Sequence, residues 1–166
     1  FLVSKNNKII KKLTLSTRDI NYTKLNRLFI NFVVDYKKVK KILFCSVVPK
    51  SFNIIKKFLS KKARLKCYEV KDLNLKSLIK IKANYKQVGS DRLTNAISLV
   101  NNTNNFIILD FGTATTFDVL IKNVYSGGII APGVRLSLNT LSDKATLIPK
   151  IDLKQIKTVI GNNTIS

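Results

Sequence analysis

The chain has 166 residues, 45% hydrophobic and 23% charged, a composition typical of a globular protein with one sizeable core or two small ones rather than of a disordered chain. Its net charge of +21 raises the possibility of a nucleic-acid partner, whereas the absence of histidine and of cysteines at metal-ligand spacing excludes a Cys/His metal site and a histidine-based triad. No apolar run approaches the roughly 20 residues that span a bilayer, and no signal peptide is recognisable, so we expect a cytoplasmic protein with no membrane contact.

The first 100 residues predict an alternation of strands and helices. Apolar residues recur at helical spacing in segments 22–33, 52–60 and 89–100, and Ser51 is the expected N-cap of the second of these helices. A polar turn at 5–8 between two short apolar stretches indicates a β-hairpin. The expected strands in this part are residues 1–4, 9–15, 41–48, 64–70 and 79–83.

The last third predicts a strand-turn-strand unit at residues 106–121, a further strand at 128–131 and a helix at 134–145. Between the two parts lies a polar, asparagine-rich link at 101–105. Because domain boundaries fall in such links, we expect an N-terminal domain of residues 1–103 and a C-terminal domain of residues 104–166.

Segment 106–121 has the pattern of a phosphate site. An apolar run ends at Asp110, and Gly112 would let the backbone approach a phosphate group. Hydroxyl and backbone N–H donors follow at Thr113, Thr115 and Thr116. A nucleoside triphosphate is the expected ligand, and the alternative from the residues alone is a turn in which these side chains bond only to their own backbone.

Two further segments carry candidate chemistry. Asp91, at the start of a predicted helix, could accept a proton from a substrate hydroxyl, or it could simply stabilise the helix through the dipole. Arg92 could pair with a substrate carboxylate. A second glycine-rich turn is expected at Gly127, Gly128 and the Pro132-Gly133 pair, which precede the last helix.

Four blocks resemble, in order and spacing, the signature segments of the type III pantothenate kinases. The blocks are VGSDRLTNA at 88–96, DFGTATT at 110–116, GGIIAPG at 127–133 and GNNT at 161–164. The resemblance covers residues 85–164 and implies an α/β, actin-like (ribonuclease H-like) fold of duplicated domains, with mixed β-sheets flanked by helices and ATP bound between the domains. By the same resemblance the chain is incomplete at both termini, because it has no match to the family's first strand and Asp-x-Gly-Asn-Thr phosphate loop, nor to its last helices.

The resemblance implies ATP-dependent phosphorylation of pantothenate to 4′-phosphopantothenate, the first step of coenzyme A biosynthesis. The implied cofactors are ATP with Mg²⁺ and a monovalent cation, K⁺ or NH₄⁺. The implied assembly is a homodimer with the pantothenate site near the interface. We expect the full-length parent to be the kinase and the 166-residue piece alone to be poorly active.

Carried over residue by residue, the resemblance makes Asp91 the catalytic base and Asp110 the ligand of the monovalent cation. The residues implied for pantothenate are Tyr85, Gly89, Ser90, Asp91, Arg92 and Thr164. The residues implied for the nucleotide are Gly112, Thr113, Thr115, Gly127 and Gly128. The sequence departs from the family between Tyr85 and Gly89, where the usual Asn-Pro element is missing.

Three other readings remain open. A non-catalytic, regulatory relative would have the same fold, and an actin-like phosphatase acting on polyphosphate would share the phosphate loops without needing the block at 88–96. A basic nucleic-acid-binding module is a reading of another class, because residues 1–88 hold 23 Lys or Arg against 4 Asp or Glu. Residues 89–149 hold 4 of each, and Lys outnumbers Arg 25 to 5, so we interpret the excess charge as a solvated surface.

Overall fold

The computed structural model describes residues 1–32, 38–64 and 66–152, which form the mixed α/β structure that the sequence predicts. The contacts within the chain define two units. Unit 1 holds Phe1–Leu75 and Gly89–Thr94, and unit 2 holds Lys76–Val88 and the residues from Asn95 onwards. None of the helices in the described ranges combines the length and the apolar character that crossing a membrane requires.

Unit 1 begins with the predicted hairpin, in which β1 (Leu2–Lys5) pairs antiparallel with β2 (Lys8–Lys12). The turn between the strands consists of Asn6 and Asn7, with φ of 50° and 60°. A type I′ turn, one of the two-residue turns that match the twist of a hairpin, needs positive φ at both positions, and asparagine tolerates this conformation better than most residues. The local sequence therefore determines this turn.

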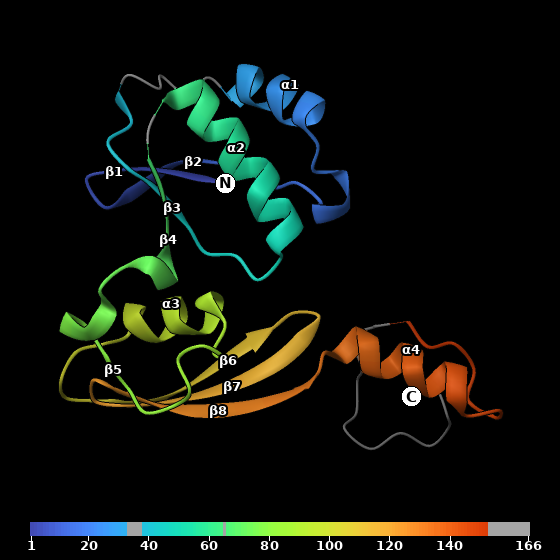
Figure 1. Ribbon diagram of the computed structural model, residues 1–166. Helices are drawn as coiled ribbons and strands as arrows, with labels where there is room; N and C mark the ends of the chain where they lie inside the picture. Colours follow the sequence, from blue (N-terminus) through green and yellow to red (C-terminus); the bar gives the residue numbers. More distant parts are fainter. Residues whose placement is uncertain (33–37, 65, 153–166) are drawn as a thin grey trace. The chain divides into compact units, whose positions relative to one another are not determined.

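The core of unit 1 lies between helix α1 (Tyr22–Phe32), helix α2 (Pro49–Ala63) and a parallel strand pair (Figure 1). The two strands are β3 (Ile42–Phe44) and β4 (Cys67–Glu69). The buried side chains of this core are Leu25, Phe29, Phe58, Leu59 and Cys67. Full burial of each large apolar side chain contributes about 1.5–3 kcal/mol, so the helical spacing seen in the sequence is the main source of stability in this unit.

Helix α2 differs from its prediction at its first residue. It begins at Pro49 rather than at residue 52, and no side chain caps its N-terminus, so the expectation that Ser51 is the N-cap is wrong. Proline suits the first turn because its fixed φ is helical and its missing N–H would have had no intrahelical partner. The helix ends at Ala63, and its C-cap Arg64 has left-handed φ and ψ of 53° and 27°.

Unit 2 is built on a four-stranded mixed sheet in the order β5-β8-β7-β6. Its strands are β5 (Lys80–Ile81), β6 (Asn105–Phe111), β7 (Ala114–Ile121) and β8 (Val124–Pro132). Strand β5 is parallel to β8, and the other pairs are antiparallel. Helix α4 (Val134–Lys144) leaves the end of β8 through Gly133 (Figure 1). Strand β8 starts four residues before the strand predicted at 128–131.

The register of β6 and β7 assigns their side chains to two faces of this sheet. Ile108 lies opposite Asp118 and Asp110 opposite Thr116, so these four side chains share one face. Helix α3 spans Ser90–Ser98, and its residues from Asn95 on belong to unit 2 and reach this face, where the Asn95 amide bonds to Asp110. This face therefore carries both apolar core residues and the acidic strand end.

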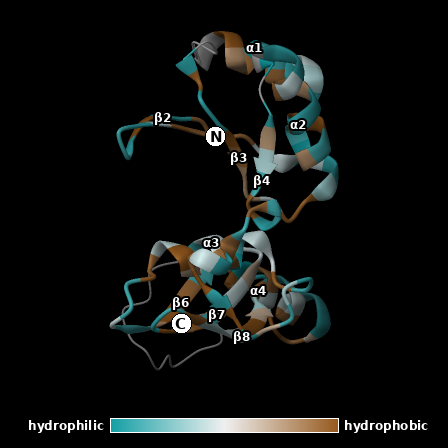
Figure 2. Ribbon diagram, turned by 60° about the vertical axis from the view of Figure 1, so that its left-hand side comes forward, coloured by the Kyte–Doolittle hydropathy of each residue, from teal (hydrophilic) through white to brown (hydrophobic). Residues whose placement is uncertain are grey.

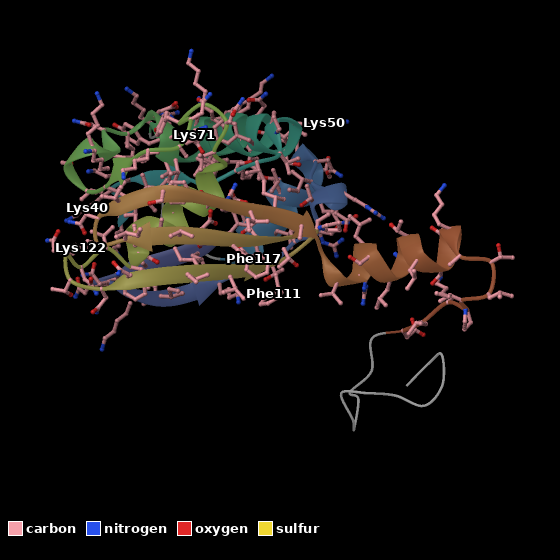
Figure 3. The ribbon with its side chains drawn as sticks, turned by 90° about the horizontal axis from the view of Figure 1, so that it is seen from below. Lys40, Lys50, Lys71, Phe111, Phe117 and Lys122 are labelled. Atoms are coloured by element: carbon pink, nitrogen blue, oxygen red, sulfur yellow. The ribbon has the colours of Figure 1, made fainter. Side chains whose placement is uncertain are left out.

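The opposite face of the sheet is apolar and open within the described part of the chain. Figure 2 shows hydrophobic stretches along β6, β7 and β8, and Figure 3 views the same strands from this side, with Phe111 and Phe117 labelled. The most exposed of its side chains are Ile107 at 69%, Leu109 at 48%, Phe111 at 69% and Ile129 at 68%. We call these four residues the open face.

A buried polar pair lies inside unit 2. Asp118 and Tyr125 are both fully buried, and the Tyr125 hydroxyl donates a hydrogen bond of 2.5 Å to Asp118 Oδ1. Burying a carboxylate costs free energy unless donors replace the water that it loses, and a hydrogen bond to a charged group contributes about 1.5–3 kcal/mol. The pair therefore links β8 to β7 diagonally, since Asp118 lies opposite Gly128 and Tyr125 opposite Leu120.

Removing that hydroxyl is expected to destabilise the protein. Tyr125→Phe should lower the free energy of unfolding by about 1.5–3 kcal/mol and the melting temperature by several degrees, measured by circular dichroism. Tyr22→Phe is the matched control, because Tyr22 is 42% exposed and packs through its ring against Phe58. Equal melting temperatures for the two variants would contradict the prediction.

Candidate functional site

The first turn of α3 is tied to the segment that follows β3. Ser90 is 1% exposed, and its hydroxyl donates to the Ser46 carbonyl at 3.0 Å and accepts from the Ser46 N–H at 3.1 Å. One turn later, the Thr94 hydroxyl donates to the Ser90 carbonyl at 2.7 Å. The reciprocal Ser46–Ser90 contact anchors the start of this helix.

Asp91 lies in the anchored turn and is half-buried. Its Oδ1 accepts a hydrogen bond from the Arg92 N–H at 2.8 Å, and the positive end of the helix dipole favours its negative charge. Gly89 provides the space for this carboxylate, because a Cβ at position 89 would lie 2.3 Å from Asp91 Oδ1. The glycine, the aspartate and the arginine that were predicted from the sequence therefore form one local arrangement in unit 1.

A second arrangement lies in unit 2, at the turn between β6 and β7. The Gly112 N–H donates to the Ala114 carbonyl at 3.0 Å, and the Gly133 N–H donates to the Thr113 carbonyl at 3.0 Å. A Cβ at position 133 would lie 2.2 Å from the Gly112 carbonyl oxygen and 2.6 Å from that of Thr113. The predicted turn at Gly112 thus meets the Pro132-Gly133 end of the second predicted segment, backbone against backbone.

Asp110 stands where β6 enters this turn. Its Oδ2 accepts a hydrogen bond of 3.0 Å from the Asn95 side-chain amide, and no lysine or arginine of the described ranges forms an ion pair with it. Thr116 lies opposite Asp110 on the same face, and its Oγ1 is buried without a hydrogen-bond partner among the described residues. A carboxylate and a hydroxyl oxygen are suitable ligands for a hard cation.

Within the described ranges, Asp110 is not part of a larger group of metal-binding side chains. Among the residues that the structure describes, no three His, Cys, Asp or Glu side chains gather into a metal-binding group.

The remaining nucleotide candidates are Thr115, which flanks this turn, and two glycines that lie away from it. Thr115 is buried, 7% exposed, and points to the face opposite that of Asp110. Gly127 and Gly128 lie inside β8, opposite Val119 and Asp118, rather than in a turn. Gly128 is five residues from Gly133, roughly 17 Å along an extended strand.

The glycine pair in β8 has a structural explanation of its own. The register of β7 and β8 shifts between Val119 and Leu120, and Gly127 has φ of 113° at this irregularity. A β-bulge commonly needs a residue with positive φ, which glycine adopts without strain.

The last two candidates belong to the predicted pantothenate set. Tyr85 lies half-buried in a turn of unit 2, where the Gln87 N–H and the Val88 N–H both donate to the Asn84 carbonyl. Thr164 and its block at 161–164 lie outside the described residues.

Sequence reasoning missed two residues that hold the candidate side chains. Ser46 fixes the start of α3, but its partner is 44 residues away and nothing in the local pattern indicates the contact. Asn95 contacts Asp110 from 15 residues away. The one available signal was its place four residues after Asp91, which puts both on the same side of a helix.

Comparisons with known proteins agree with the motif blocks. The model of the family described as type III pantothenate kinase matches residues 1–166. A type III pantothenate kinase of Pelagibacter ubique is 62% identical over 165 residues, which are 99% of this chain and 66% of that protein. A protein of the same name from a Sulfurihydrogenibium species is 39% identical over 83% of this chain and 56% of its own length. Another, from Desulforapulum autotrophicum, is 34% identical over 94% of this chain and 61% of its own length. The chain therefore spans between 56% and 66% of the length of these relatives.

Proposed function

The chain belongs to the type III pantothenate kinase family, and we propose on this premise that the protein phosphorylates pantothenate with ATP to give 4′-phosphopantothenate, the first step of coenzyme A biosynthesis. The observation that carries the proposal is that the family match runs over the whole chain, so that it includes both the Asp91 segment and the Asp110 turn.

In the proposed reaction, the substrate hydroxyl attacks the γ-phosphorus of ATP. The bond between the γ-phosphorus and the bridging oxygen breaks, ADP leaves with that oxygen, and Asp91 takes the hydroxyl proton. Phosphoryl transfer depends mainly on positioning and on charge stabilisation, so the base has to orient the hydroxyl rather than deprotonate it early. Asp91 suits this role because its carboxylate is held by the Arg92 N–H at 2.8 Å on an anchored helix turn. Arg92 is proposed to pair with the carboxylate of pantothenate, and Gly89 and Ser90 to shape this end of the pocket.

The nucleotide is proposed to bind at the turn where Gly112 and Gly133 meet. Gly112 leaves room beside the turn for phosphate oxygens, because it has no Cβ, and Thr113 adds a hydroxyl there. Mg²⁺ would accompany the triphosphate and neutralise part of its charge. The family resemblance adds Thr115, Gly127 and Gly128 to the nucleotide residues, and these remain proposals that rest on the resemblance alone.

A monovalent cation, K⁺ or NH₄⁺, is proposed to bind Asp110 with neutral oxygens around it. The residues fit such an ion, since Asp110 pairs with no lysine or arginine of the described ranges and the buried Thr116 hydroxyl on the same face has no partner there. The bound cation would offset negative charge near the triphosphate.

Tyr85 and Thr164 complete the proposed pantothenate site, which in a homodimer would lie near the subunit interface. We further propose that the protein acts in the cytoplasm and that residues 1–103 and 104–166 are parts of two duplicated actin-like domains. On this proposal the 166-residue chain alone binds ATP poorly and turns over little, because it spans only 66% of the Pelagibacter ubique relative.

The proposal is tested with two proteins, the 166-residue chain and a chimera in which the 165 aligned residues of the Pelagibacter ubique relative are replaced by this chain. Pantothenate-dependent release of ADP is measured at saturating ATP, Mg²⁺ and K⁺, with the unaltered relative as reference. We expect turnover from the chimera and little or none from the chain alone. A folded chimera that releases no ADP while the relative is active would refute the kinase assignment, and full activity of the chain alone would refute the expected need for the longer protein.

A further inference from the structure

The contact between Asn95 and Asp110 joins a helix to the strand end of the proposed cation site. Asn95 Nδ2 donates to Asp110 Oδ2 at 3.0 Å, and both residues belong to unit 2. The donor is well held: the Asn95 carbonyl accepts from the Ser98 hydroxyl at 2.7 Å, and the next residue, Ala96, is fully buried. A donor on a packed helix can hold a partner side chain in one orientation.

The chemistry of the donor also matters. The chain has 30 lysines and arginines, yet none in the described ranges pairs with Asp110, which is held by a neutral amide. A lysine or arginine would orient the carboxylate but also neutralise it, whereas an amide orients it and leaves its negative charge in place. The contact thus preserves the charge that a cation needs.

The hydrogen bond also distinguishes the two oxygens of the carboxylate. Oδ2 is occupied by Asn95, and Oδ1 makes no hydrogen bond or ion pair with the described residues. Fixing one oxygen restricts the directions in which the other points. An exposed aspartate at a strand end would otherwise rotate freely, and a cation would have to order it on binding.

We propose that Asn95 is a positioning residue that holds the carboxylate of Asp110 in the orientation that binds the monovalent cation. The inference rests on the proposed function, because the cation site is part of that function. It adds a role for a residue of α3 that neither composition nor the motif blocks assigned.

The test uses the chimera and three substitutions. Asn95→Leu removes the amide and keeps a similar volume, Asn95→Gln keeps the amide on a longer side chain, and Ser98→Ala is the control on the same helix, which removes only the bond to the Asn95 carbonyl. The first readout is thermal stabilisation by KCl without substrates, with choline chloride keeping the ionic strength constant because the chain carries +21 charges. The second is the K⁺ concentration that gives half-maximal ADP release.

Asn95→Leu is expected to raise both K⁺ midpoints by about tenfold, because the lost hydrogen bond is to a charged group, while kcat at saturating K⁺ changes less than twofold. Asn95→Gln should recover part of the shift, and Ser98→Ala should leave both midpoints unchanged. An unchanged K⁺ midpoint in Asn95→Leu, or an unsubstituted chimera that KCl does not stabilise beyond choline chloride, would overturn the inference. A thermal K⁺ midpoint that shifts as expected in a chimera that does not phosphorylate pantothenate would support the inference and refute the proposed function alone.

Discussion

Replacing Asp91 with asparagine is expected to lower the kcat of the chimera by roughly 10²- to 10⁴-fold, the range that a positioned acid or base contributes. The amide has the same shape and its oxygen can still accept from the Arg92 N–H, which Asp91 does at 2.8 Å, so the helix turn should be retained. What the variant loses is the ability to take the proton of the substrate hydroxyl. The measurement is the steady-state rate of pantothenate-dependent ADP release over a range of pantothenate concentrations.

The control for this prediction is Asp72→Asn, the same chemical change at an exposed position of unit 1. Its kcat should equal that of the unsubstituted chimera, and the melting temperatures of both variants should lie within about 2 °C of it, since surface changes alter stability by less than about 0.5 kcal/mol. A kcat for Asp91→Asn within threefold of the unsubstituted value would remove Asp91 from the mechanism.

The role of Asp91 has a second test at Gly89. A Cβ at position 89 would lie 2.3 Å from Asp91 Oδ1 and 3.4 Å from Val47 Cγ1, so Gly89→Ala has to displace the carboxylate, whereas the backbone need not move. A misplacement of about 1 Å in a reacting group can cost about 10²-fold in rate, and a comparable loss of kcat is expected here with little change in melting temperature. Normal kcat in this variant would mean that the observed position of Asp91 is not the catalytic one.

Gly133→Ala is expected to destabilise the protein and to impair nucleotide binding together. The new Cβ would lie 2.2 Å from the Gly112 carbonyl oxygen and 2.9 Å from the Thr113 carbonyl carbon, and both are backbone atoms. Because backbone cannot turn aside as a flexible side chain can, the turn or the start of α4 must shift, at a cost of about 1–3 kcal/mol. Thermal unfolding with and without ATP measures both effects.

Gly112→Ala provides the matched comparison for stability in the same turn. Its Cβ would come no closer than 3.6 Å to the Ala114 carbonyl oxygen, an ordinary contact, so its melting temperature should stay near that of the unsubstituted chimera. If Gly112→Ala lowers the melting temperature as much as Gly133→Ala does, crowding at Gly133 is not the cause of the destabilisation.

Much of the fold follows from local sequence patterns. The helices from residue 22 and from residue 134 begin where apolar periodicity begins, and the hairpin turn follows from two asparagines. Strand β8 was predicted too short because the adjacent glycines Gly127 and Gly128 are typical of a turn. In the structure, pairing with β7 extends the strand through both glycines. The positive φ that glycine adopts easily serves a β-bulge at Gly127 and not a turn.

The candidate site was predictable where its geometry is local and not where it depends on tertiary contacts. Gly89 and Asp91 are two residues apart, and the clash that the glycine avoids follows from that spacing. The bond from Asn95 to Asp110 depends on how the last turn of α3 packs against β6, and the Ser46–Ser90 contact on how the segment after β3 meets the start of the helix. Neither position is determined by residue order alone, because many packings satisfy the same hydrophobic pattern.

The open face has a colloidal consequence for handling this protein. At low ionic strength the +21 charge keeps molecules apart, but at 0.1 M salt the Debye length falls to about 10 Å and that repulsion is largely screened. The open face then exposes an apolar patch that is no longer protected by long-range electrostatic repulsion between molecules. The patch consists of Ile107, Leu109, Phe111 and Ile129. Concentrated solutions of the chain should therefore become turbid through aggregation when salt is added. This is the reverse of salting-in, in which added salt raises the solubility of a charged globular protein.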